Sequence, residues 1–323
     1  MSAARWLLLV TVLAAAALLA IIVGTISIPI SDVWRAFGGS ADTMPAMVVR
    51  TLRLPRVALA ILVGAGLGMS GAALQGTMRN PLAEPYLLGV SGGAAVGAVL
   101  GSAFGIGAAL LPIAAFVGAI VAVATAFAVA HAAGARGDPR MLLMAGVVVG
   151  AFANAAIMVV LANAEPNTVR NSLWWMMGSV SDATWPQIAV LFLYVLAAGT
   201  ALVLLGRHID ILALGEDAAA GLGLRVDATI RWVFIVSSLM AAATVAAAGL
   251  VGFVGLVVPH LVRAGGVRRH RPLLLGSALT GATLVVLSDL LGRVLRPPAE
   301  LPLGAVTALI GVPFFLVKLR RLT

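Results

Sequence analysis

Two short patterns could mark enzyme chemistry in this chain. The stretch GVSGG at 89–93 fits the G-x-S-x-G pattern of a nucleophilic serine, with Ser91 at its centre. That pattern requires a strand before the serine, whereas here it opens a long apolar segment. The phosphate-binding pattern G-x-x-x-x-G-K-[ST] is absent, because Lys318, the only lysine, lies between Val317 and Leu319. We therefore assign no catalytic residue and no cofactor, and ATP-driven work would need a separate ATPase subunit.

Arginines gather at the ends of two apolar segments that are far apart in the sequence. They are Arg50, Arg53, Arg56, Arg293 and Arg296. An arginine at a helix end can reach lipid headgroups, and its planar guanidinium can also bind a carboxylate through two parallel hydrogen bonds. Of these two alternatives we favour docking of an acidic partner. Asp289, four residues before Arg293, is expected to pair with it locally.

A second polar region, the loop 207–227, carries two acids followed by alanines and glycines. Acids stabilise a helix N-terminus and glycine commonly follows a helix C-terminus, so we expect a short helix there. Its small residues would allow close docking on a partner protein, and the alternative is a helix that lies on the bilayer. The candidate residues are Leu214, Gly215, Glu216, Asp217, Ala218, Ala219, Gly221 and Leu222.

Several polar side chains fall within or beside apolar segments, where contact with lipid would be costly. Those inside segments are Gln75, Asn154, His260 and Asp289. His260 is either a satisfied structural group or part of a pathway. Arg170, Trp174 and Met176 follow the fifth segment, where an interfacial belt would place such side chains. A proton relay would need more acids in series, so an ion-coupled secondary transporter is the weaker alternative.

Long charge-free runs place the chain among polytopic all-helical membrane proteins. Of its 323 residues 62% are hydrophobic, against about 45–50% in soluble domains. Charges and prolines divide it into about ten segments, each expected to span the membrane. They lie near 6–27, 57–76, 86–105, 110–132, 141–163, 187–206, 228–248, 250–264, 272–292 and 303–318. The first is expected to be an uncleaved helix rather than a signal peptide, and 168–178 a short helix at the membrane surface.

The distribution of basic residues predicts the orientation. With both termini in the cytoplasm, about two thirds of the 21 lysines and arginines would lie inside, including a basic loop at 136–140, as the positive-inside rule requires. The net charge of +9 therefore reflects topology rather than nucleic-acid binding. The absence of cysteine excludes disulfides and thiolate metal sites. We expect one transmembrane domain over 1–323, in the inner (cytoplasmic) membrane, surrounded by lipid.

Six motifs stand in order along nearly the whole chain. They are LRLPR, GxxLxxSGAxxQ, NPLAEPxLLGVSGGA, LGEDAAAGLGL, GFVGLVVPHLVR and SDLLGRVLRPPAELPLGAVTALIGVPFF. Together they resemble the FecCD-type permease subunits of ABC importers for ferric siderophores, haem and vitamin B12. The resemblance implies a homodimer that works with two ATP-binding-cassette subunits and with a periplasmic or lipid-anchored substrate-binding protein.

The resemblance also implies roles for particular residues. Arg53, Arg56 and Arg293 would pair with glutamates on the two lobes of the binding protein. The helix within 214–224 would insert into a cleft on the ATPase subunit. The fifth helix and the short helix after it would line the translocation path at the dimer interface, and the candidate residues there are Asn154, Arg170, Trp174 and Met176. The expected cargo is an iron complex, either haem or a ferric siderophore, and the alternative is cobalamin.

Overall fold

The computed structural model describes residues 2–24, 27–37, 43–134 and 139–319, and every regular element in these ranges is a helix. Seven helices are long and apolar enough to cross a membrane. They are α1 (Ala3–Ile22), α4 (Leu54–Thr77) with an N-terminal extension, α6 (Leu111–Ala132), α7 (Pro139–Ala162), α9 (Trp185–Leu212), α11 (Val226–Ala248) and α13 (His270–Val294). Three further apolar helices are shorter: α5 (Val90–Ala103), α12 (Val254–Ala264) and α14 (Leu303–Leu319). The all-helical membrane fold predicted from the sequence is thus confirmed, while most of the expected basic loop at 136–140 lies outside the described residues.

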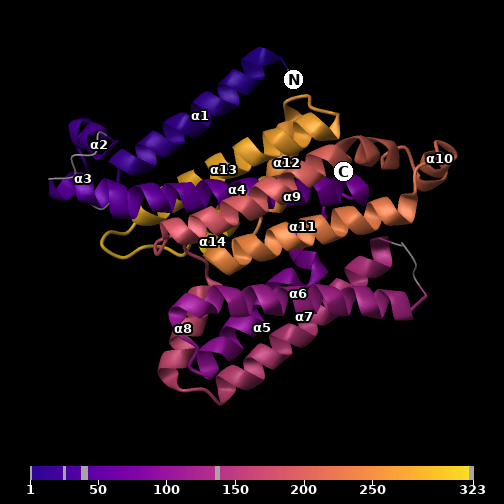
Figure 1. Ribbon diagram of the computed structural model, residues 1–323, viewed down its shortest axis with the longest axis horizontal. Helices are drawn as coiled ribbons and strands as arrows, with labels where there is room; N and C mark the ends of the chain where they lie inside the picture. Colours follow the sequence, from indigo (N-terminus) through magenta and orange to yellow (C-terminus); the bar gives the residue numbers. More distant parts are fainter. Residues whose placement is uncertain (1, 25–26, 38–42, 135–138, 320–323) are drawn as a thin grey trace.

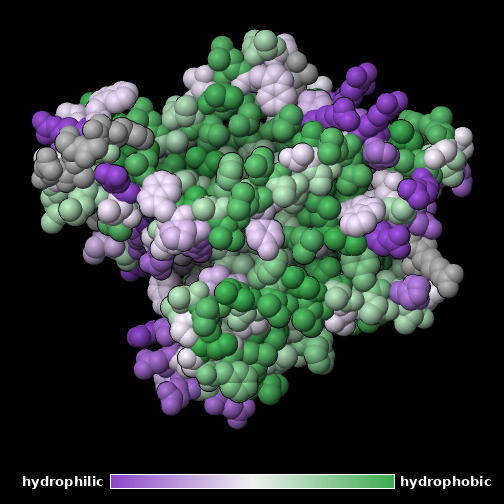
Figure 2. All heavy atoms as spheres, in the orientation of Figure 1, coloured by the Kyte–Doolittle hydropathy of each residue, from purple (hydrophilic) through white to green (hydrophobic). Residues whose placement is uncertain are grey.

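Helix α4 runs through the middle of the molecule and packs against α13, α11, α9 and α12, with α5, α6 and α7 grouped to one side (Figure 1). The short helices α2 (Ile30–Phe37) and α3 (Met44–Val48) lie at one end of the long axis, and α10 (Glu216–Gly221) lies at the other. We refer to these as the α2–α3 end and the α10 end. Figure 2 shows apolar side chains across the middle of this face and hydrophilic ones gathered toward the two ends, the distribution that a bilayer-spanning protein requires.

Glycines allow the backbones around α4 to touch. A methyl group at Gly64 would overlap the carbonyl group of Gly281 on α13, and one at Gly71 would overlap Gly255 on α12. On the other side of the molecule, Gly93 of α5 is pressed in the same way against Gly118 of α6. Small residues at helix contacts are the usual means of close packing in membranes, where burial of apolar surface supplies little driving force. Close approach of the helix backbones at these glycines is therefore a main feature of the packing.

Helices α5 and α12 each begin four residues later than the segments predicted from the sequence. The segment expected at 86–105 forms a 3₁₀ turn (Pro85–Leu88) and then α5, which has 14 residues. The segment expected at 250–264 becomes helical only at Val254, giving α12 just 11 residues. Backbone conformation explains both late starts, because Gly89 has φ 82° and Phe253 has φ 65°, values outside the right-handed helical region.

The residues that precede α5 and α12 form hydrogen bonds with each other. The Tyr86 hydroxyl donates to the Val251 carbonyl and accepts from the Val251 N–H, both at 3.1 Å. The Glu84 carboxylate accepts from the N–H of Phe253, immediately before α12. Irregular backbone at membrane depth is tolerated only where protein groups pair with it. These contacts therefore allow two incomplete helices to remain inside an apolar protein.

An N-terminal extension makes α4 part of a continuous helix from Met44 to Thr77, 34 residues long and well beyond the expected 57–76. It consists of α3, a π-helical turn over Val49–Arg53, and α4 itself. Thr43 begins it by accepting a hydrogen bond from the N–H of Ala46. Arginines that the sequence analysis placed before the second span therefore lie on a rigid helix, which fixes the directions in which they point.

The two short helices predicted between spans are both present. The piece expected at 168–178 forms α8 (Pro166–Met176), and the loop 207–227 contains α10. Proline at the first position of α8 suits a helix start, because the missing N–H would have no partner there. In α10 the acids Glu216 and Asp217 occupy the first turn, as predicted.

Candidate functional site

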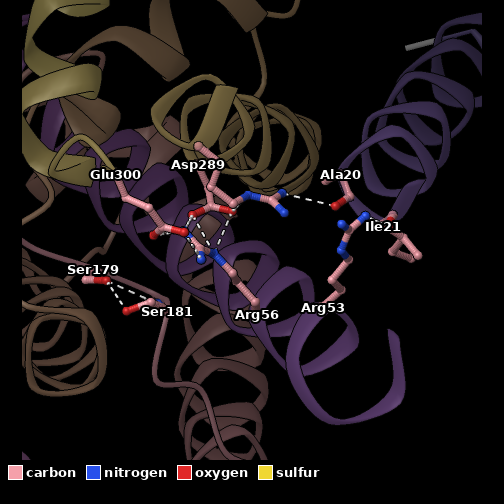
Figure 3. Close-up of polar contacts among 9 residues, drawn as sticks. Ala20, Ile21, Arg53, Arg56, Ser179, Ser181, Asp289 and Glu300 are labelled. Atoms are coloured by element: carbon pink, nitrogen blue, oxygen red, sulfur yellow. Dashed lines mark hydrogen bonds and ion pairs between the residues drawn. The ribbon is translucent and has the colours of Figure 1, made fainter. Parts of the chain in front are cut away.

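Arg56, on the first turn of α4, is held by two carboxylates from distant parts of the chain (Figure 3). Its Nε and Nη2 atoms donate to Oδ1 of Asp289 at 2.9 and 2.7 Å. Its Nη1 and Nη2 atoms donate to the two carboxylate oxygens of Glu300 at 2.9 and 2.8 Å. Each carboxylate thus occupies one edge of the guanidinium, the arrangement that gives the strongest arginine–carboxylate pairing.

Arg53 and Arg293 lie deeper and close the end of α1. Arg53 donates to the carbonyls of Ile21 and Ile22, and Arg293 donates to that of Ala20 at 3.0 Å. The last carbonyls of a helix have no partner within it and carry partial negative charge, so cations stabilise that end. Both arginine side chains are buried. Arg293 also forms the predicted ion pair with Asp289, with Nε and Oδ2 separated by 3.2 Å.

The five arginines therefore occupy two levels at the α2–α3 end. Arg50 and Arg296 are exposed, whereas Arg53 and Arg293 are buried and Arg56 is largely covered. A cavity of about 440 Å³ opens beside the three covered arginines, lined by Arg53, Arg56, Arg293 and Glu300 together with apolar residues of the extension of α4. We call the three inner arginines with Asp289 and Glu300 the arginine cluster.

At the opposite end, α10 presents a small apolar surface. Leu214 and Leu222, on either side of the helix, are 67% and 65% exposed. Ala218 is also exposed, whereas Ala219 is fully buried and anchors the helix to the rest of the protein. An ion pair of 3.2 Å between Arg79 and Glu216 connects the turn after α4 to α10. An exposed apolar helix with small residues is suited to binding another protein.

The residues predicted to line a path lie on α7 and α8. Asn154 is exposed in the middle of α7, where Met158, one turn later, is 72% exposed. Arg170 and Trp174 are exposed on α8, whereas Met176 is partly buried and packs against the contact between α5 and α7. An amide facing hydrocarbon is costly, so exposure of Asn154 favours a partner subunit or an aqueous path on this face.

Gln75 supplies a hydrogen bond that the backbone of α12 lacks. Pro259 has no N–H, so it cannot bond the carbonyl of Gly255 four residues earlier. The Gln75 amide donates to that carbonyl at 3.2 Å and to Leu256 O at 3.1 Å, while its own oxygen accepts from Arg263 at 2.6 Å. His260 is also buried, with Nε2 3.0 Å from the carbonyl oxygen of Pro81. This contact favours the structural alternative for His260.

Sequence reasoning missed the partners of these groups. Glu300 was not identified as a site residue, because no local pattern relates it to Arg56, 244 positions away. The hydrogen bonds of Glu84 with Phe253 and of Tyr86 with Val251 were likewise not predicted. The contact between Gln75 and Gly255 did leave a signal, since proline at 259 predicts an unpaired carbonyl at 255.

Comparison with known proteins shows which family shares this architecture. The pattern of the FecCD transport family matches residues 11–321. An uncharacterised ABC transporter permease, YvrB of Bacillus subtilis, is 39% identical over 96% of this chain and 91% of its own length. The cobalamin import permease BtuC of Halobacterium salinarum is 41% identical over 85% of this chain and 73% of its own. The hemin transport permease HmuU of Yersinia pestis is 36% identical, covering 92% of this chain and 90% of its own.

A solved structure shares the fold along the whole chain. The structure described as an inward-facing conformation of a putative metal-chelate type ABC transporter superposes with a TM-score of 0.84. It is 30% identical and the alignment covers 97% of both chains. The fold described above is therefore that of a known transporter architecture.

Proposed function

Because the chain belongs to the FecCD transport family, it is the permease subunit of an ABC importer, and we propose that it imports an iron complex across the inner membrane. The observation that supports this most is the family match over residues 11–321, which spans nearly the whole chain. We further propose that it acts as a homodimer, that two separate ATPase subunits energise it, and that a substrate-binding protein delivers the cargo.

The positions of the two candidate surfaces support this division of labour. The arginine cluster adjoins the first turn of α4, at the α2–α3 end, whereas α10 lies at the other end of the long axis (Figure 1). In our proposal the binding protein docks at the α2–α3 end, with Arg50 and Arg296 making the first contacts above Arg53, Arg56 and Arg293. The ATPase binds Leu214, Leu222 and the intervening residues of α10. Conformational change then passes between the ends through rigid helices.

The proposed homodimer would place α7 and α8 at the subunit contact. Exposed Asn154 and Met158 on α7, with Arg170 and Trp174 on α8, would then face the path rather than lipid. We propose haem or a ferric siderophore as the cargo, with cobalamin as the alternative, because relatives of similar identity are named for hemin, Fe(3+) dicitrate and cobalamin. An ion-coupled transporter stays the weaker alternative, since no series of buried acids among the described residues suggests an ion pathway.

Reconstitution in proteoliposomes tests the function. We expect the permease, its ATPase and its binding protein together to take up labelled haemin or ferric siderophore in an ATP-dependent manner. Ala218→Trp, on the exposed face of α10, should reduce uptake by about tenfold or more, because a bulky ring prevents close docking of the ATPase. Ala133→Trp, at an exposed position after α6, is the matched control and should leave uptake unchanged.

Three outcomes would contradict the proposal. Uptake driven by a proton gradient without the ATPase would favour a secondary transporter. Uptake of labelled cobalamin with no uptake of either iron complex would establish the alternative cargo. Equal losses in Ala218→Trp and Ala133→Trp would show that α10 has no special role in coupling.

A further inference from the structure

The arginine cluster carries a feature that docking alone does not explain. All but one of the N–H groups that Arg56 could offer to a partner are already used, since Asp289 takes one edge of the guanidinium and Glu300 takes the other. A carboxylate from another protein would therefore find no free edge on Arg56. Docking on this residue requires that one of its two present partners leave.

The two partners differ in how easily they could leave. Asp289 is 4% exposed and lies between Arg56 and Arg293, so its departure would place two cations together in a buried site. Glu300 is 38% exposed and contacts only Arg56 within the cluster. The cost of separating an ion pair rises with its burial, so the half-covered pair with Glu300 costs less to break than the buried pair with Asp289. Glu300 is therefore the partner that can be exchanged.

The backbone around Glu300 allows that exchange without unfolding of the loop between α13 and α14. The N–H of Leu301 donates to Gly292 O at 3.0 Å, and the N–H of Leu303 donates to Gly178 O at 3.1 Å. These bonds hold the chain immediately after Glu300, so a rotation of its side chain alone can free the Arg56 edge. The cavity lined by Arg53, Arg56 and Arg293 provides space for an incoming carboxylate.

Charge favours an acidic occupant. Three arginines face two acids in the cluster, and departure of Glu300 would leave an excess of two positive charges beside the exposed Arg50 and Arg296. We propose that Glu300 binds Arg56 only in the free permease. During docking, a carboxylate of the substrate-binding protein competes with Glu300 and takes its place on the Arg56 guanidinium. This inference rests on the docking proposed above.

The variant Glu300→Gln tests the competition in the complete importer, reconstituted in nanodiscs. The probe is the importer's own cargo-loaded substrate-binding protein, and its Kd is measured at low and high salt. Loss of the competing charge should tighten binding roughly two- to fivefold at low salt, with a smaller effect at high salt. Glu300→Ala, which vacates the edge completely, should tighten binding at least as much.

Asp182→Asn is the matched control. Asp182 is exposed in the loop before α9, next to Ser181 of the same cavity wall, and no ion pair among the described residues holds it. Its neutralisation removes the same charge without releasing an arginine, so it should tighten binding less than Glu300→Gln. An equal decrease in Kd in the two variants would show that only the loss of a negative charge matters, and it would overturn the inference.

The double variant Arg50→Glu with Arg296→Glu separates failure of the inference from failure of docking. It should weaken binding, whereas the same reversal at Arg207 and Arg231, which are exposed toward the α10 end, should not. If the first double variant binds normally, the docking surface lies elsewhere and both proposals fail. If it binds weakly while Glu300→Gln is unchanged or weaker than wild type, docking stands and Glu300 only secures its loop.

Discussion

At the scale of single residues, the environment of a charge decides its importance in this protein. Asp289 is almost completely buried between Arg56 and Arg293, whereas Glu216 pairs with Arg79 at the surface, with both side chains nearly half exposed. The nitrogen–oxygen distance is 3.2 Å both in the Arg293–Asp289 pair and in the Arg79–Glu216 pair. The burial of Asp289 makes its loss expensive, because two guanidinium groups would remain without their shared counter-charge.

The variants Asp289→Asn and Glu216→Gln test this contrast. We expect Asp289→Asn to lower the free energy of unfolding by about 3–5 kcal/mol. Glu216→Gln should change it by about 1 kcal/mol or less, because solvent screens the exposed pair. Denaturant unfolding of the isolated subunit in detergent measures both values. Similar losses in the two variants would refute the buried ion-pair account of the arginine cluster.

At the scale of helices, contact between backbones holds α4 in the centre of the molecule. Gly64 and Gly281 approach each other from α4 and α13, and neither position has room for a methyl group. Gly150, in the middle of α7, is different, since a methyl group there would meet no atom within 4 Å. Packing therefore requires glycine at positions 64 and 281. Within the isolated subunit, packing does not require glycine at position 150.

Alanine substitution distinguishes these two kinds of glycine. Gly64→Ala should destabilise the subunit by about 1–3 kcal/mol, because α4 and α13 must move apart. Gly150→Ala should be neutral or stabilising by up to about 1 kcal/mol, through the better helix propensity of alanine. Thermal unfolding of the isolated subunit in detergent measures the difference. A Gly64→Ala subunit as stable as wild type would show that α4 tolerates a wider separation.

At the scale of the whole molecule, the proposed mechanism requires the arginine cluster and α10 to face opposite compartments. The chain contains no cysteine, so single cysteines can be introduced without a background. Ala299→Cys, in the exposed loop beside Glu300, should react with a membrane-impermeant maleimide in intact spheroplasts. Leu222→Cys, beside α10, should react only after permeabilisation. Labelling of both positions from the same side would exclude the transporter described here.

Much of this architecture could be predicted from the sequence, because the signals are local. The length of an apolar run predicts a membrane-spanning helix, as α9 and α13 illustrate. Acids followed by small residues and glycine predicted the short helix α10. The motifs in order along the chain predicted the family, since each motif is read without knowledge of its neighbours in space.

Contacts between distant segments were decided only by the tertiary structure. The sequence showed that Arg56 could bind a carboxylate, and the fold supplied Asp289 and Glu300, 233 and 244 residues away. The sequence also showed apolar runs around α5 and α12, but their late starts depend on Gly89 and Phe253 and on the pairing of Tyr86 with Val251. The type of a residue fixes which bonds it can form, whereas the packing of helices determines which partner lies within reach.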